Sequence, residues 1–239
     1  MTVEAGSVAE GCGDPALRIA IVGAESTGKT ELAAALAERI AQLTGLQVTW
    51  VPEVLRGWCE RHSRTPRQDE QRSIMTEQHA RIDAAAADAD VVVCDTTALM
   101  TAVYSQIVFD DGSLDDRAAV LHASIDLTLL TALDLPWVAD GLQRDGPQVR
   151  EPVDTRLRAL LARHRLSWSL VGGQGGARLD AALDAVAPLL RQRTEGKVAA
   201  GRGLFTRLAD RNAEPAAQQW SCEFCDDPGC EHRLLQLRG

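Results

Sequence analysis

Short apolar runs alternate with amphipathic stretches along most of the chain. Because the runs are short and continuously apolar, they predict strands buried on both faces. These strands are expected at residues 17–23, 46–53, 90–97, 124–134 and 166–173. Helical periodicity is expected at residues 30–45, 69–89, 151–165 and 178–193, the last kinked or broken near Pro188. Alternating strands and helices predict an α/β domain over 17–193, with a parallel sheet flanked by helices.

Composition and charge narrow the function classes. The 239 residues are 45% hydrophobic, which is enough for a buried core, and the net charge is −9. An acidic balance argues against general nucleic-acid binding, which calls for a basic face. The chain has no apolar run of membrane-spanning length and no signal peptide, so we expect a cytoplasmic protein that does not bind a membrane. Residues 1–16 read as a flexible leader.

The segment after the first expected strand has the pattern of a phosphate-binding loop. It fits G-x-x-x-x-G-K-[ST] and comprises Gly23, Ala24, Glu25, Ser26, Thr27, Gly28, Lys29 and Thr30. Gly28 lets backbone N–H groups close around an oxyanion, and Lys29 reaches the β- and γ-phosphates. The Thr30 hydroxyl is a ligand for Mg²⁺, and the N-terminus of the following helix favours negative charge. The pattern therefore predicts ATP binding with Mg²⁺.

Other polar side chains follow the expected strands at their carboxyl ends, where ligands bind in parallel sheets. Asp95 follows "VVVC" and is expected to act on Mg²⁺ or as a base on the incoming hydroxyl. Thr96, next to it, is a candidate substrate contact. Glu53 and Arg56 follow the second strand, where a small-molecule kinase holds its acceptor. The chain is short for an AAA machine, and no Asn-Lys-x-Asp guanine signature is present, which leaves a small-molecule kinase.

A kinase of this kind also needs arginines that close over the triphosphate. The segment "DGLQRDGPQVREPVDTR" supplies Arg144, Arg150 and Arg156 in a loop that contains Gly and Pro and opens a helix. We expect Arg144 and Arg150 to be catalytic, together with Lys29, Asp95 and Glu53.

Several motifs together resemble one family. "GAESTGKT", "PEVLR", "EQHARID", "CDTTALMT" and above all "DLPWVADGLQRDG" are similar to the nicotinamide riboside kinase domain of the bacterial NAD-biosynthesis regulator, a P-loop family with AAA-like ATPases. The resemblance covers about residues 17–193. It departs from the family pattern at Gln143, where the family has an arginine that this chain carries one place later.

The resemblance implies transfer of the ATP γ-phosphate to the 5′-hydroxyl of nicotinamide riboside. It implies that Gly23 to Thr30 bind ATP and Mg²⁺, and that Asp95 and Glu53 face the acceptor hydroxyl and ribose. It also implies that Trp137 and Asp140 line the closing site with the lid arginines.

The C-terminal segment has a separate chemistry. Cys222, Cys225, Cys230 and His232 form C-x₂-C-x₄-C-x-H around a Pro-Gly turn. Four soft ligands at this spacing suit a structural Zn²⁺ site, like a zinc knuckle. We expect a linker with a short helix at 194–215 and this tail at 216–239, docking on a protein partner or on the chain itself.

The sequence thus predicts an ATP-dependent kinase of a nucleoside-like acceptor, with nicotinamide riboside first. Two alternatives stay open. One is a deoxynucleoside kinase, which also places a carboxylate after the second strand. The other is an ATP-binding regulator whose zinc tail meets a partner.

Overall fold

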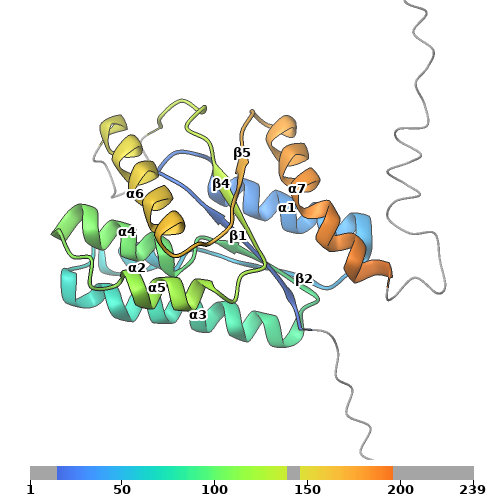
Figure 1. The fold of residues 1–239 in the computed structure, drawn as a ribbon, viewed down its shortest axis with the longest axis horizontal. Coiled ribbons are helices and arrows are strands. Elements are labelled where there is room, and N and C mark those ends of the chain that lie inside the picture. Colours follow the sequence, from blue (N-terminus) through green and yellow to red (C-terminus); the bar gives the residue numbers. More distant parts are fainter. Residues whose placement is uncertain (1–14, 139–145, 196–239) are drawn as a thin grey trace, which may run out of the picture. The chain divides into compact units, whose positions relative to one another are not determined.

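The computed structural model describes residues 15–138 and 146–195, which form a sheet with helices packed on both faces (Figure 1). The strands are β1 (Leu17–Val22), β2 (Val48–Val51), β3 (Val91–Asp95), β4 (Leu127–Thr131) and β5 (Ser169–Val171). The helices are α1 (Lys29–Thr44), α2 (Val54–His62), α3 (Gln71–Asp88), α4 (Ala98–Phe109), α5 (Asp115–His122), α6 (Arg150–Arg163) and α7 (Gly176–Glu195). Two 3₁₀ turns, Gln68–Glu70 and Pro147–Val149, precede α3 and α6.

The five strands form one sheet in the order β2-β3-β1-β4-β5, and every neighbouring pair is parallel. Helices α1 and α7 cover one face, and α3, α4, α5 and α6 cover the other (Figure 1). A parallel sheet must be covered on both sides because its strands are apolar on both faces. The predicted α/β fold with a parallel sheet flanked by helices is confirmed.

The strand register brings the predicted site residues to one edge of the sheet. Ile21 lies beside Asp95 at the ends of β1 and β3, and Val51 of β2 lies beside Cys94. The loops that follow β1, β2 and β3 therefore leave the sheet side by side. This edge, at the carboxyl ends of the strands, is where open α/β sheets bind ligands.

Some helices are too buried or too short to be predicted from hydrophobic periodicity. Eight of the twelve residues of α4 are buried, from Ala98 to Ser105, so this helix has little polar face to reveal its period. Helices α2 and α5 have only nine and eight residues. The sequence does not predict α4 or α5, and it predicts only a turn or helix at Glu53 and Arg56, where α2 begins.

Helix α7 corrects a further expectation. It runs through Pro188 as one element, so the chain is not broken there. Proline cannot donate to the carbonyl four residues earlier, that of Asp184, but the helix continues on both sides. Among the described residues, no helix has both the length and the apolar character of a membrane span.

Candidate functional site

The loop from Gly23 to Thr30 connects β1 to α1 and has the backbone that the motif requires. Gly23 has φ of 151°, and a Cβ atom there would collide with the Thr131 hydroxyl of β4, so only glycine fits. Thr131 Oγ1 donates to Thr27 Oγ1 at 2.7 Å, and Thr27 Oγ1 donates to the Ala24 carbonyl at 2.8 Å. This chain of hydroxyl groups fixes the loop to the neighbouring strand.

The polar end of the loop joins β3. Lys29 Nζ donates to the Ala24 carbonyl at 2.6 Å, which folds the ammonium over the loop. Thr30 Oγ1 donates to Asp95 Oδ2 at 2.6 Å. Asp95 Oδ1 is buried and has no hydrogen-bond partner within the described part of the chain. An unpaired carboxylate oxygen beside a threonine hydroxyl fits the oxygen ligands that Mg²⁺ prefers.

Glu53 occupies the position just before α2, makes no capping hydrogen bond to the helix, and lies half-buried at the same edge. The pKa of Glu53 is raised to about 7, mainly by burial and also by Asp95 and Glu25, against the opposing effects of Lys29 and Arg56. Burial also raises the pKa of Asp95, but the hydrogen bond from Thr30, with Lys29 and Arg56, works against it. Lys29 and Arg56 therefore lower the pKa of both carboxylates, but the hydrogen bond from Thr30 lowers that of Asp95 alone. Glu53 has the pKa of a base that works near neutral pH.

A cavity of about 310 Å³ opens beside the phosphate-binding loop. It is bounded by the loop, by α2 and α4, and by the segments before α3 and α6. Its lining residues are Glu25, Ser26, Lys29, Glu53, Leu55, Arg56, Cys59, Glu60, Thr65, Pro66, Gln71, Tyr104, Val108, Phe109, Trp137, Gly146 and Val149. This size is typical of small-molecule sites. Of the predicted substrate residues, Glu53, Arg56 and Trp137 all line it.

Tyr104, Phe109 and Trp137 are the aromatic residues that line the cavity. Tyr104 of α4 is buried, and burial together with Glu25 and Glu53 raises its pKa well above the usual range, so its phenol stays protonated. Trp137 lies in the segment after β4, and the next residue, Val138, accepts a hydrogen bond from Ser26 Oγ at 2.6 Å. That bond ties the phosphate-binding loop to the Trp137 segment.

Gln78 of α3 holds the backbone on both sides of Glu53. Its Oε1 accepts from the Val54 N–H at 2.8 Å, and its Nε2 donates to the Pro52 carbonyl at 3.5 Å. Gln78 is buried, although "EQHARID" reads as a solvated helix face. A glutamine in a charged stretch gives no local signal for this role, because its partners lie more than twenty residues earlier.

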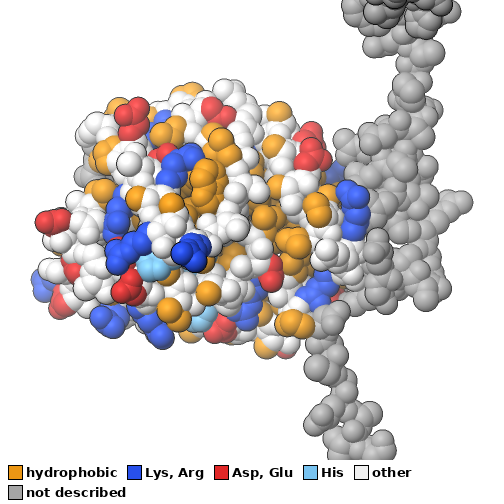
Figure 2. Space-filling model, viewed as in Figure 1, with side chains coloured by type: hydrophobic (Ala, Val, Ile, Leu, Met, Phe, Trp, Pro, Cys, Tyr) orange, Lys and Arg blue, Asp and Glu red, His pale blue; other side chains and the backbone are white. Residues whose placement is uncertain are grey.

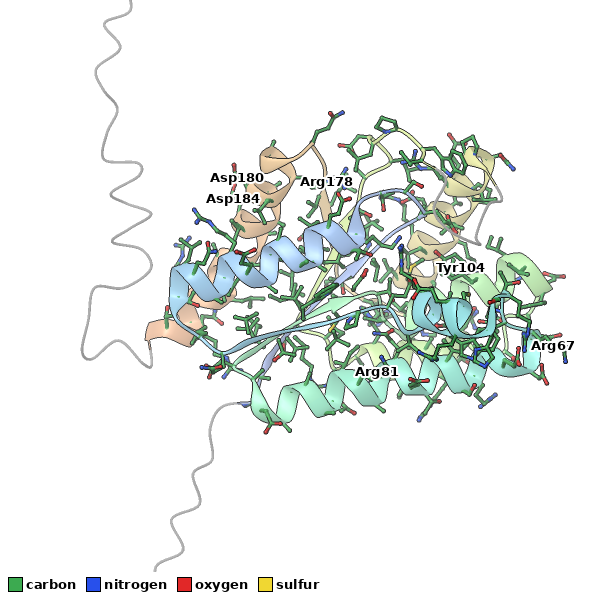
Figure 3. The ribbon with its side chains drawn as sticks, turned by 180° about the vertical axis from the view of Figure 1, so that it is seen from behind. Arg67, Arg81, Tyr104, Arg178, Asp180 and Asp184 are labelled. Atoms are coloured by element: carbon green, nitrogen blue, oxygen red, sulfur yellow. The ribbon has the colours of Figure 1, made fainter. Side chains whose placement is uncertain are left out.

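Arg178 of α7 joins three loops. Its guanidinium donates to the Gly173 carbonyl and the Thr27 carbonyl, each at 2.9 Å, and pairs with Asp134 after β4. Arg178 and Tyr104 lie on opposite sides of the sheet (Figure 3). Arg178 therefore supports the phosphate-binding loop from the face away from the cavity. Nothing in the sequence near it predicts this contact, which spans 151 positions.

Of the three predicted lid arginines, the structure describes Arg150 and Arg156. Arg150 is the one that lies near the phosphate-binding loop. It begins α6, is buried, and donates from Nη1 to the Leu135 carbonyl at 2.8 Å. Its Nε and Nη2 atoms are buried without a partner among residues 15–138 and 146–195. Leu135 also packs close to Gly28, so Arg150 lies near the loop. Arg156 instead pairs with Asp115 of α5.

Of the remaining predicted site residues, the structure describes Thr96 but not the others. Thr96 is buried with φ of 69°, a strained value for a β-branched residue, and it does not line the cavity. Its neighbour Thr97 shares a hydrogen bond of 2.9 Å with the buried His122. Asp140 and Arg144 lie outside the described residues, as do Cys222, Cys225, Cys230 and His232, so their roles stay predictions.

Charge on the visible surface is mixed. Over α5 and α6, basic side chains lie among acidic and histidine side chains (Figure 2). Within this surface Arg163 contacts Asp115 and Asp116, and His164 contacts Asp116, each at 3.6 Å.

Solved structures share the fold. A NadR protein in complex with NR aligns with a TM-score of 0.60 and 21% identity, over 72% of this chain and 50% of that one. A NadR protein with NAD and AMP-PNP gives 0.58 and 22%, over 78% and 51%. Thymidylate kinase from Ehrlichia chaffeensis gives 0.52 and 16%, over 73% and 99%. The chain thus spans about half the length of the NadR structures, and at these identities the likeness shows the fold alone.

Comparison of sequences gives the family. No curated protein matches the chain significantly. A family profile described as an AAA domain matches residues 18–178, which is more than half of the chain and includes the phosphate-binding loop, Glu53, Asp95 and Arg178. The chain therefore belongs to this AAA-domain family of P-loop proteins.

Proposed function

We propose that this protein is an ATP-dependent kinase of a nucleoside-like acceptor, with nicotinamide riboside as the first candidate. One observation carries the proposal: a cavity of about 310 Å³ has Lys29 and Ser26 of the phosphate-binding loop on one side and Glu53, with a pKa of about 7, on another. An acceptor in this cavity would lie between a group that holds the triphosphate and a group that accepts a proton.

The residues divide the reaction between them. The acceptor hydroxyl attacks the γ-phosphorus, its proton passes to the Glu53 carboxylate, and the bond to the β-phosphate oxygen breaks to release ADP. Lys29 and Arg150 would stabilise the transferred phosphoryl group. Thr30 and Asp95 fit Mg²⁺, which supplies positive charge at the β- and γ-phosphates. Asp95 serves this role better than that of base, because it bonds Thr30 and does not line the cavity.

The charge of the cavity favours an acceptor without a phosphate. Glu25, Glu53 and Glu60 line it together with the cations Lys29 and Arg56. Lys29 is assigned to ATP, which leaves one arginine against three carboxylates. A nucleoside monophosphate brings close to two negative charges. This supports a nucleoside over a thymidylate-like acceptor, and a cationic nucleoside such as nicotinamide riboside fits best.

A substrate panel tests the proposal. The full chain is given ATP and Mg²⁺ with nicotinamide riboside, ribonucleosides, deoxynucleosides or thymidylate, and ADP release is measured. We expect turnover that depends on the acceptor, with thymidylate inactive. Lys29→Ala should lower it at least ~100-fold, because an ammonium at the developing charge is lost. Arg39→Ala, which removes another cation of α1, is the control.

Two outcomes would redirect the assignment. Hydrolysis of ATP at the same rate with and without any acceptor would favour the regulatory ATPase. Strong turnover of deoxynucleosides with none of nicotinamide riboside would favour the deoxynucleoside kinase.

A further inference from the structure

The phosphate-binding loop contains a carboxylate that faces the cavity. Glu25 is half-buried and lines the cavity together with Tyr104 and Glu53. A carboxylate directed at a triphosphate would oppose its binding by like-charge repulsion. Glu25 was expected to bind ATP with the rest of the loop, but its side chain lies on the side where an acceptor would bind.

The neighbours of Glu25 locate it further. Glu25 lines the cavity together with Glu53 and Tyr104, and its charge raises the pKa of both groups. Asp95 does not line the cavity, and its Oδ2 accepts the hydrogen bond from Thr30. Glu25 is therefore assigned to the side of the site where Glu53 would accept the proton. It is not assigned to the side where Thr30 and Asp95 would hold Mg²⁺.

The unpaired atoms of the cavity define what a ligand must supply. Glu25 Oε2 is buried and has no hydrogen-bond partner in the described ranges of the chain. Gln71 Oε1, which belongs to another residue of the same cavity, is also buried without a partner there. Both are acceptors, and buried acceptors are costly to leave unpaired. A ligand that presents hydroxyl or amide N–H donors would satisfy them.

We propose that Glu25 is a specificity-determining residue that accepts a hydrogen bond from a second sugar hydroxyl of the acceptor. This inference rests on the proposed function. Glu53 takes the reacting hydroxyl, and Glu25 lines the same cavity, so we assign the group that reaches Glu25 to the same sugar. Tyr104 lines the same cavity, and its phenol stays protonated, so it supplies a hydrogen-bond donor on that side. The pair selects ribose over 2′-deoxyribose and makes no contribution to ATP affinity.

Glu25→Gln in the full chain tests this assignment, because it keeps the shape of the side chain and removes its charge. Acceptor affinity and ATP affinity are measured separately by titration calorimetry, and KM and kcat are measured for ribose and 2′-deoxyribose acceptors. We expect the ribose acceptor to bind roughly 10-fold more weakly, since a charge-assisted hydrogen bond is lost. ATP affinity should stay within about twofold, and the preference for ribose should fall. Glu31→Gln removes an exposed carboxylate from the first turn of α1 as a matched control.

A second variant keeps the proposal falsifiable if Glu25→Gln is poorly folded by circular dichroism. Tyr104→Phe should weaken ribose acceptors in the same direction and by less. Loss of ATP affinity equal to the loss of acceptor affinity, or an unchanged preference for ribose, overturns the inference while leaving the kinase assignment intact. A wild-type protein that binds ATP but no nucleoside overturns the proposed function and this inference with it.

Discussion

At the scale of single residues, the site depends on two carboxylates with different surroundings. Asp95 accepts a hydrogen bond from Thr30, whereas Glu53 lines the cavity. Burial raises both pKa values, and for Glu53 the result is about 7. When the surroundings of two titrating groups give them different pKa values, the two groups can take distinct roles in one site.

The pKa of Glu53 predicts the pH dependence of catalysis. A base must be deprotonated, so kcat/KM should rise with pH and level off above about 7. Glu53→Gln should lower kcat at least ~100-fold and remove this limb from the profile. A Glu53→Gln protein that keeps both its turnover and the limb near pH 7 would transfer the role of base to Asp95.

The same shift affects stability, and the direction follows from linkage. The pKa of Glu53 is higher in the folded chain, about 7, than the ordinary 4.5 expected when unfolded, so the unfolded state holds fewer protons between these values. Stability from this residue is therefore present below about pH 4.5 and is lost as pH rises to about 7. Glu53→Gln should raise the free energy of unfolding at pH 8 by about 1–3 kcal/mol and leave it unchanged at pH 4. Urea unfolding at the two pH values measures the difference, with Glu31→Gln as control.

At the scale of elements, the buried strands and the long helices could be predicted because each carries a clear period. The predicted strands at 46–53 and 166–173 shorten to Val48–Val51 and Ser169–Val171 in the structure. The ends of a strand depend on its pairing with neighbouring strands, and the local sequence carries no information about that pairing. Helix α4 escaped prediction because it is surrounded by other elements. The residues of the phosphate-binding loop could be predicted because they form a contiguous motif. Gln78 and Arg178 could not, because their partners are distant in the sequence.

The contact between α3 and the start of α2 leads to a prediction at this scale. Gln78→Met keeps the length of the side chain but leaves the buried Val54 N–H without its acceptor. The change should cost about 1–3 kcal/mol of stability and displace Glu53. We expect kcat to fall and ATP affinity to remain, as seen by thermal unfolding and titration. Glu77→Gln, which alters the exposed pair with Arg81, is the control. Normal kcat in a destabilised Gln78→Met protein would limit Gln78 to a structural role.

At the scale of the whole molecule, the chain combines the family domain with a C-terminal segment of different composition. The Cys/His tail lies outside the described residues, so its metal site stays a prediction from spacing alone. Such a segment has too little apolar surface to order itself by burial, and a bound metal would supply that free energy.

Elemental analysis of the full chain tests the tail. We expect about one zinc per chain, lost in Cys225→Ser and released as pH falls, because thiolate and imidazole ligands become protonated. ATP affinity should be equal in the two proteins, since no tail residue belongs to the phosphate-binding loop. Metal-free protein purified without chelators would show that the tail cysteines are plain thiols.

Arg178 contacts three groups at once, and this restricts which residues can replace it during evolution. An ion pair usually tolerates exchange of its two members over evolution, because opposite charges still meet. Here Arg178→Asp combined with Asp134→Arg would place a carboxylate against the carbonyl oxygens of Thr27 and Gly173, which offer no hydrogen to it. Lysine has a donor for each partner but not the planar fork that reaches all three loops. Descendants of this chain are therefore expected to keep arginine at 178, while position 134 can drift between the two acidic residues.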